Sequence, residues 1–278
     1  MEKIIKLLYS ILPKKVINYI GKSNLLKPFR NKILRPDNVE LITKENISWG
    51  KGTFDFYAPI KITTKAKTKG IENKLLRNSL KLMSDYNIDN PIILDIGANY
   101  GFVSLALQSN LKDNAQIFSF EPHPLIAETF QKSITANKFE NIKLINAAVG
   151  NKDCEIELNL YGHTSNILSL ENRKSQKITI NQINLDNYLL KNNIVPNFIK
   201  IDVDGYEIEV LEGLKENLLK NSPIMVVETN YEKKVIDFLI NECSYKLLDL
   251  DLKEFEKIPD NVFCIPNQKI IKNNNFTK

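Results

Sequence analysis

From residue 70 onward, short continuous apolar runs alternate with segments in which apolar residues recur every three or four positions. Continuous runs are typical of strands buried on both faces, and the wider spacing is typical of amphipathic helices. The pattern predicts strands at 91–97, 116–122, 143–150, 198–205, 223–229, 245–250 and 261–266. It predicts helices at 71–86, 101–110, 124–139, 206–220 and 231–243. Strands separated by helices imply a parallel sheet, and the last two strands, which no helix separates, imply an antiparallel edge.

Two parts of the chain depart from this regular order. Residues 154–161 and 176–189 alternate apolar and polar positions, which predicts an antiparallel hairpin inserted after the third strand. Ahead of residue 70, the segments 38–43 and 52–68 predict another antiparallel strand pair. The fold class that follows is α/β: a Rossmann-like, mostly parallel sheet with helices on both faces and an antiparallel last strand. We expect a small helical and β extension at 1–69 and the main domain at 70–278.

The N-terminal extension is strongly basic. Residues 1–35 hold nine Lys and Arg against the single acid Glu2, whereas the whole chain carries a net charge of +5. Apolar residues at helical spacing in residues 1–20 predict an amphipathic helix that either packs on the main domain or lies on an anionic membrane surface. No apolar run approaches the roughly 18 residues that span a bilayer, and no signal-peptide cleavage site is visible. We therefore expect a cytoplasmic protein with at most peripheral membrane contact through residues 1–35.

The composition narrows the classes of protein further. Apolar residues make up 43% and charged residues 26% of the chain, which is typical of a globular domain. The three cysteines, Cys154, Cys243 and Cys264, are too scattered for a disulfide framework or a zinc knot. Only four of the 38 basic residues are arginines, which argues against a protein that reads bases in nucleic acid.

The clearest chemical signal is the turn after the first predicted strand of the main domain. Asp95 ends the apolar run, Gly97 and Gly101 open the following helix, and Asn99 supplies a polar side chain between them. We expect Gly97 to permit the tight turn and Gly101 to let a ligand approach the backbone. The pattern is not the dinucleotide motif GxGxxG, because an acid stands where a pyrophosphate would be repelled. It favours a ligand that carries an ammonium and a sulfonium.

The ends of the next two strands complete a predicted cofactor site. Glu121, followed by Pro122, ends the second strand, where an acid accepts hydrogen bonds from both ribose hydroxyls. Tyr100 is expected to contact the methionine part of the ligand. The end of the third strand is expected to border the adenine through Asn146, Ala147 and Ala148. The combination predicts S-adenosylmethionine as the cofactor.

The segments "LDIGANYGFVSLAL", "FSFEPHPLIAETF", "NAAVG", "FIKIDVDGYEIEVLEGL" and "PIMVVE" follow one another along the chain. In these segments the chain resembles the FkbM family of S-adenosylmethionine-dependent methyltransferases, over about residues 70–250. Glu72 matches an acid that the family carries ahead of the glycine turn, whereas Asp204 stands where the family more often has glutamate. The resemblance implies a class I methyltransferase fold and methylation of sugar hydroxyls or polyketide-type products.

An acidic cluster is predicted at the tip of the strand 198–205. Strand alternation places Lys200, Asp202 and Asp204 on one side, and Glu228 ends the next strand. In one alternative, Asp202 and Asp204 hold a divalent cation and Lys200 activates the acceptor hydroxyl. In the other, which we favour, no metal is needed: Asp202 is the general base and the other acids position a sugar. Glu207, expected to contact the substrate, also suits a first helical turn as a simple cap.

Both histidines are weaker candidates. His123 lies at the tip of the second strand, nearer the predicted ribose than the methyl group, and is a possible base. His163 lies in the hairpin insertion and is expected either to contact the acceptor or to be an exposed loop residue.

The favoured function is O-methylation of a small-molecule or glycan acceptor. An RNA methyltransferase is the alternative that the basic N-terminus suggests, although the segment Ile201–Gly205 has no proline or aromatic residue to stack a base. A nucleotide-dependent oxidoreductase is disfavoured by the acid before Gly97, and a non-catalytic membrane-surface module remains an alternative. A methyltransferase that modifies a lipid-linked glycan would use both the basic N-terminus and the sugar chemistry.

Overall fold

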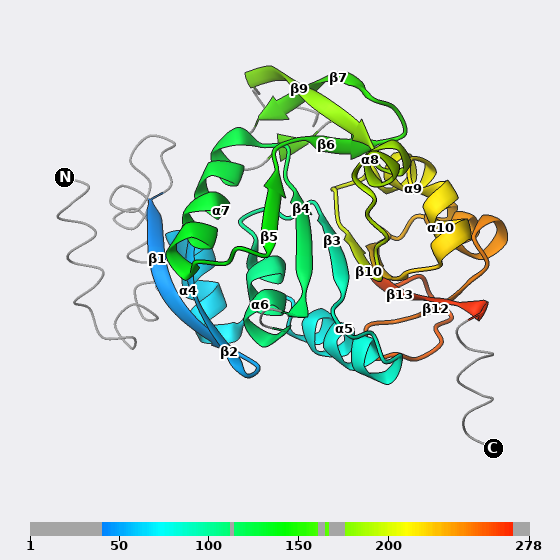
Figure 1. Cartoon of the computed structure of the whole chain (residues 1–278), viewed down its shortest axis with the longest axis horizontal. Helices are drawn as coiled ribbons and strands as arrows, with labels where there is room; N and C mark the ends of the chain where they lie inside the picture. Colours follow the sequence, from blue (N-terminus) through cyan, green and yellow to red (C-terminus); the bar gives the residue numbers. More distant parts are fainter. Residues whose placement is uncertain (1–40, 112–113, 161–164, 167–175, 269–278) are drawn as a thin grey trace, which may run out of the picture.

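The computed structural model describes residues 41–268 except 112–113, 161–164 and 167–175 (Figure 1). Its centre is a sheet in the order β12-β13-β11-β10-β3-β4-β5. The strands of this sheet are β3 (Ile92–Ile96), β4 (Gln116–Phe120), β5 (Ile142–Ile145), β10 (Phe198–Ile201), β11 (Ile224–Glu228), β12 (Tyr245–Leu248) and β13 (Asn261–Pro266). The first five are parallel to one another, and β13 is antiparallel to both of its neighbours. The predicted Rossmann-like class with an antiparallel last strand is confirmed.

Helices cover both faces of this sheet because successive strand side chains point to opposite sides. Ile93 packs in one core together with the helices α5 (Asn73–Asp85), α6 (Phe102–Leu111) and α7 (Pro124–Asn137). Leu94 and Ile96 belong to the core on the other face. The helical elements on that face are α8 (Leu185–Asn192), α9 (Glu207–Glu212), α10 (Lys215–Asn221) and α11 (Lys233–Asp237), which continues into the π-turn η2 (Phe238–Glu242).

The strand order reverses beside β3. The chain runs from β3 outward through β4 and β5, and then returns to place β10 on the other side of β3. In a sheet of this kind the crevice beyond the carboxyl ends of the two central strands is the favoured ligand site. The turns that begin at Gly97 and at Asp202 leave β3 and β10 at this point.

An antiparallel hairpin and a helix precede the sheet. They are β1 (Ile42–Trp49), β2 (Gly52–Pro59) and α4 (Ile60–Lys69). Phe54 and Phe56 of β2 meet the ring of Phe102 edge-on, with centroids 5.5 and 5.3 Å apart, so the hairpin shares the core of α6. The strand pair is confirmed, but its predicted limits, 38–43 and 52–68, are wrong. Residues 60–69 form a helix that buries Thr63 and Ala66.

The insertion after β5 forms a small sheet at the top of Figure 1, in the order β6-β9-β7-β8. Its strands are β6 (Ala148–Gly150), β7 (Cys154–Leu160), β8 (Ser165–Asn166) and β9 (Gln176–Asn184). The predicted hairpin is confirmed by the antiparallel pairing of β7 with β9. The single strand predicted at 143–150 is wrong, since β6 leaves the central sheet and pairs with β9. The strand predicted at 176–189 ends at Asn184, whose side chain accepts a hydrogen bond from the backbone N–H of Asn187 and caps α8.

The helix predicted at 206–220 is divided into α9 and α10 around Gly213. Gly213 lies against the insertion sheet, where an added Cβ would come within 2.0 Å of the Gly150 carbonyl oxygen. This close approach of two backbones brings the turn between α9 and α10 against the end of β6.

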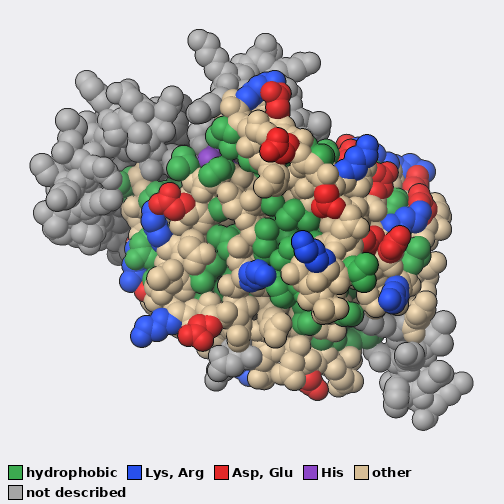
Figure 2. Space-filling view, turned by 45° about the horizontal axis from the view of Figure 1, so that its top comes forward, with side chains coloured by type: hydrophobic (Ala, Val, Ile, Leu, Met, Phe, Trp, Pro, Cys, Tyr) green, Lys and Arg blue, Asp and Glu red, His purple; other side chains and the backbone are tan. Residues whose placement is uncertain are grey.

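Within the described residues, no helix combines the length and apolarity needed to cross a bilayer. On the face drawn in Figure 2, acidic and basic side chains are interspersed outside the grey residues, so neither sign dominates there. Residues 1–35, for which membrane contact is expected, lie outside the described residues, as does His163.

Gly101 gives a direct test of the packing between α6 and α7. Its φ is +81°, and an added Cβ would lie 2.0 Å from the ring of Phe130, a side chain with no exposed surface. We expect Gly101→Ala to lower the free energy of unfolding by about 2–4 kcal/mol, because the left-handed backbone and the overlap both carry a cost. Chemical denaturation measures this loss. Phe130→Leu in the same chain should recover part of it, and a fully additive pair would contradict the explanation.

Candidate active site

The turn after β3 is held by its own hydrogen bonds. Gly97 has a φ of +75°, and a Cβ there would come within 1.8 Å of the Asp202 carbonyl oxygen, so only glycine fits between the two turns. The N–H groups of Gly97 and Ala98 both donate to the Phe120 carbonyl, at 3.0 and 2.9 Å. Gly101, which was predicted to let a ligand approach the backbone, does not line the cavity described below, and a Cβ there would meet the Phe130 ring.

Beneath this turn lies a buried ionic network. Lys200 and Asp95 are neighbours in the register of β10 and β3 and are 5% and 0% exposed. The Lys200 Nζ atom donates to the Gly97 carbonyl at 2.9 Å and lies 3.1 Å from Asp202 Oδ2 and 3.5 Å from Asp95 Oδ1. Ser104 donates to the other Asp95 oxygen at 2.6 Å. Burial alone would lower the pKa of Lys200, but the two carboxylates raise it well above its usual value.

This network changes the predicted role of Asp95. The carboxyl group lies under the glycine turn and does not line the cavity described below. Asp95 therefore supports the turn through Lys200 and Ser104 and, in this structure, is not placed for the direct cofactor contact that we predicted. The Lys200 ammonium donates to the Gly97 carbonyl and pairs with two carboxylates of the protein, which makes Lys200 a positioning residue.

Glu121 lies at the end of β4 with both carboxylate oxygens engaged. Oε2 accepts from the backbone N–H of Asn99 and Oε1 from that of His123, each at 2.8 Å. Burial raises the pKa of Glu121 to about 7 against the opposing effect of these two hydrogen bonds. Glu121 thus joins the turn after β3 to the start of α7. His123 itself caps α7, its Nδ1 accepting from the Leu125 N–H at 3.2 Å, which does not support its prediction as a base.

A cavity of about 340 Å³ opens between these turns. Among its lining residues are many that the sequence predicted to bind the cofactor: Glu72, Gly97, Asn99, Tyr100, Glu121, Pro122, Ala147 and Ala148. Asn146 is not among them. Its side-chain amide donates to the carbonyls of Glu121 and Pro122 at 2.7 and 3.0 Å, and so shapes the turn that borders the cavity.

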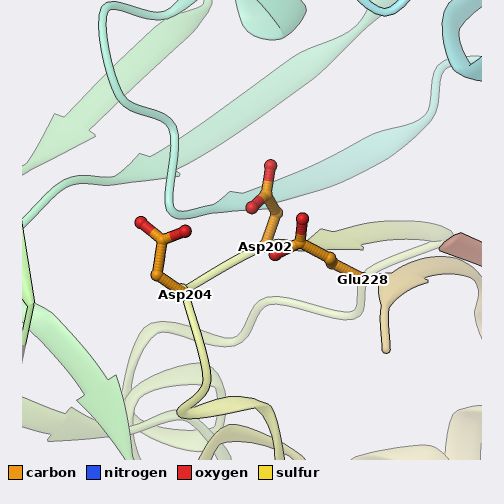
Figure 3. Close-up of side chains that lie close together, drawn as sticks. All are labelled: Asp202, Asp204 and Glu228. Atoms are coloured by element: carbon orange, nitrogen blue, oxygen red, sulfur yellow. The ribbon is translucent and has the colours of Figure 1, made fainter. Parts of the chain in front are cut away.

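Three carboxylates meet where β10 and β11 end. Asp202, Asp204 and Glu228 each bring an oxygen within 4.8 Å of the others, and Figure 3 shows the three carboxylates close together. Asp204 has a φ of +54°, a left-handed conformation, just before Gly205. Carboxylate oxygens are the ligands that Mg²⁺ and Ca²⁺ prefer, so these residues are the ones that would hold a divalent cation. The predicted cluster is therefore brought together.

The same geometry separates the pKa values of Asp202 and Glu228. Burial and the negative charge of Asp202 raise the pKa of Glu228 to about 8. Burial also acts on Asp202, but the nearby Lys200 ammonium outweighs it and lowers the pKa of that group. At neutral pH the pair therefore shares one proton. Glu228 carries it and donates a hydrogen bond to the Asp202 carboxylate.

A second cavity of about 440 Å³ adjoins the cluster. Its lining is strongly acidic and consists of Glu72, Asp202, Glu228, Asp249, Leu250, Asp251, Pro259, Asp260 and Asn261. Glu72 and Asp202 line both cavities, so the two spaces meet at these side chains.

Glu207 does not line either cavity, contrary to the predicted substrate contact. It is 1% exposed, and its Oε1 accepts from the N–H groups of Gly205 and Val203 at 3.1 and 3.3 Å. Asn230 donates to the same oxygen at 3.2 Å. Glu207 therefore fixes the turn that carries Asp204. It supports the position of the acidic cluster without lining either cavity.

The structure adds wall residues that the sequence did not indicate. Lys65 of α4 lines the first cavity, although its segment was predicted as a strand. Tyr206 directly follows residues 201–205, which contain no aromatic residue, and it also lines this cavity. Its hydroxyl donates to Gln182 of β9 at 3.2 Å, which ties the cavity wall to the insertion sheet.

The strand order, the glycine turn and the acid at the end of β4 define a class I, Rossmann-like methyltransferase. The sequence profile of the methyltransferase FkbM domain matches residues 95–247, more than half of the chain. The protein belongs to the FkbM methyltransferase family.

Individual relatives are distant. Methyltransferase 1 of Beauveria bassiana is 25% identical over 150 residues, and the match spans 46% of this chain and 60% of that protein. The structure of methyltransferase FkbM from Methylobacillus flagellatus aligns with a TM-score of 0.44 at 14% identity, over 63% of this chain and 43% of that one. A 16S rRNA methyltransferase of T. thermophilus, in complex with AdoMet and guanosine, aligns with a TM-score of 0.48 at 13% identity, over 84% and 52% of the two chains.

Proposed function

We propose that this protein transfers the methyl group of S-adenosylmethionine to a hydroxyl of a sugar, a glycan or a related natural product. The observation that carries the proposal is the junction of the two cavities at Glu72 and Asp202. Methyl transfer requires a donor and an acceptor whose reacting atoms are held in line, and two cavities that meet at a carboxylate suit that requirement.

In this proposal the donor occupies the first cavity. Its adenine lies between Ala147, Ala148 and Leu158, and its ribose hydroxyls donate to the remaining lone pairs of Glu121. The sulfonium then lies between the turn at Gly97 and the acidic cluster, where negative charge stabilises it.

The acceptor occupies the second cavity, whose carboxylates accept hydrogen bonds from sugar hydroxyls. The attacking hydroxyl oxygen forms a bond to the methyl carbon while the carbon–sulfur bond breaks, and the sulfonium becomes a neutral thioether. Asp202 accepts the hydroxyl proton, and Lys200 and Glu228 hold its carboxylate in place. No step of this transfer needs a metal, although Asp202, Asp204 and Glu228 would hold a divalent cation that polarised the hydroxyl.

An RNA acceptor is less well supported. The acceptor cavity contains six carboxylates and no lysine or arginine among its described lining residues, and a phosphate backbone would be repelled there. A non-catalytic membrane-surface module would not need two adjoining cavities.

The first test is binding of the donor and its product by isothermal titration calorimetry. We expect micromolar affinity for S-adenosylhomocysteine, corresponding to about −8 kcal/mol. Glu121→Ala should weaken it roughly 10- to 100-fold, because a charged acceptor of ribose hydrogen bonds is lost. Asp251→Ala is the matched control, because Asp251 lines only the second cavity, and it should retain binding of S-adenosylhomocysteine. Failure of the folded wild-type protein to bind either ligand would refute the proposal.

A further inference from the structure

One of the lysines that line the donor cavity forms no ion pair with the described residues. Its charged lining residues are Lys65, Glu72, Glu121, Lys200, Asp202 and Asp204. Of the two lysines, Lys200 donates to the Gly97 carbonyl and forms ion pairs with Asp95 and Asp202. Lys65 is exposed, and the part of the chain that the structure describes offers it no acidic partner within ion-pair distance.

S-adenosylmethionine brings one negative group into this acidic wall. Its methionine end carries an α-carboxylate beside an α-ammonium, and a carboxylate among acids needs a donor or a cation. Several carboxylates in the cavity lining can pair with the α-ammonium, whereas very few groups there can pair with the α-carboxylate.

The backbone of the glycine turn does not supply one. The N–H groups of Gly97 and Ala98 donate to Phe120, and that of Asn99 donates to Glu121 at 2.8 Å. The N–H of Tyr100 donates to the Asn99 side chain at 2.8 Å, and that of Gly101 donates to Ala98 at 2.8 Å. Every N–H from residue 97 to residue 101 is therefore satisfied before a ligand binds, and the first turn of α6 follows as a backbone alternative.

The helix α4 and the turn that follows it contribute two opposite charges to the lining of the cavity. α4 ends at Lys69, and the chain turns through Gly70, with a φ of +75°, and Glu72, with a φ of +49°. Lys65 before the turn and Glu72 after it both line this cavity, as do Ile62 and Ile71. Both residues precede the segment 95–247 that matches the family profile.

We infer that Lys65 binds the α-carboxylate of S-adenosylmethionine, while Glu72, which lines the same cavity, binds its α-ammonium. This inference rests on the proposed function, since it concerns the donor of that reaction. It assigns the recognition of the amino-acid end of the donor to α4 and the turn that follows it, both of which lie outside the matched family domain. The rest of the donor is held by the family segment.

The test compares two ligands that differ only at this end. S-adenosylhomocysteine carries the amino-acid group, and 5′-methylthioadenosine has a methyl group in its place. We expect Lys65→Gln to weaken S-adenosylhomocysteine about tenfold in isothermal titration calorimetry, since a charge-assisted hydrogen bond is lost. The affinity for 5′-methylthioadenosine should stay unchanged, and Lys65→Arg should retain most of the affinity for S-adenosylhomocysteine.

Lys61→Gln is the matched control, because Lys61 is exposed one turn earlier on α4 and does not line the cavity. It removes the same charge and should leave both affinities unchanged. Equal effects of Lys65→Gln and Lys61→Gln, or an equal loss for both ligands, would overturn the inference and leave the carboxylate to the first turn of α6. That result is distinct from failure of the proposed function, in which the wild-type protein binds neither ligand.

Discussion

Lys200→Met should lower the free energy of unfolding by about 3–5 kcal/mol, because it leaves buried carboxylates without their cation. Asp95 has no exposed surface, and its Oδ1 atom has no hydrogen-bond donor within the described residues, so Lys200 at 3.5 Å is its main electrostatic partner. Methionine keeps the length of the side chain but supplies no charge. Chemical denaturation of the two proteins at pH 7 measures the difference.

A surface ion pair gives the matched control. Lys74 lies 2.9 Å from Asp251, and the side chains of this pair are 59% and 52% exposed. Lys74→Met should cost less than about 1 kcal/mol, since solvent screens such pairs. Asp95→Asn combined with Lys200→Met should be less destabilising than the sum of the single changes. A loss for Lys200→Met no larger than for Lys74→Met would show that the network does not hold the turn.

Because the apolar runs are long and regular, the sequence predicts the central sheet well. The prediction fails where one pattern of apolar and polar residues is compatible with both a strand and a helix. In residues 60–68 apolar and polar residues alternate as in a strand, yet Thr63 and Ala66 lie on the buried face of a helix. Packing against the hairpin decides between the two, and that contact is not visible in the local sequence. The start of α8 carried a signal that was overlooked, because Asn184 and Asp186 are a typical N-cap and first-turn acid.

The sequence likewise predicted one part of the candidate site and missed another. Parallel strands bring their carboxyl ends to one edge, so an acidic cluster that includes Asp202, Asp204 and Glu228 was predicted there, and these three carboxylates do lie together. The depth of each side chain relative to the turn was not predictable, because it depends on packing between distant segments. For this reason Asp95 and Glu207 prove to be supports under the turns.

Asp202→Asn should lower the rate of methyl transfer to a sugar acceptor by 10²–10⁴-fold, because the amide cannot accept the hydroxyl proton. Binding of S-adenosylhomocysteine should be retained, since this product carries no sulfonium for Asp202 to stabilise. The two measurements separate proton transfer from cofactor binding. Equal losses in both would indicate that Asp202 only shapes the cavity.

The pH dependence of the rate identifies the proton that Asp202 shares with Glu228. The pKa of Glu228 is raised to about 8, so its carboxyl group is protonated below this pH and donates a hydrogen bond that weakens Asp202 as a base. As the pH rises through 8, Glu228 becomes charged, Asp202 becomes a stronger base, and kcat/KM should rise to a plateau. Glu228→Gln keeps a hydrogen-bond donor but cannot lose a proton, so its profile should stay flat across this range. A rise with the same midpoint in Glu228→Gln would mean that another group titrates and that the pair does not set the basicity of Asp202.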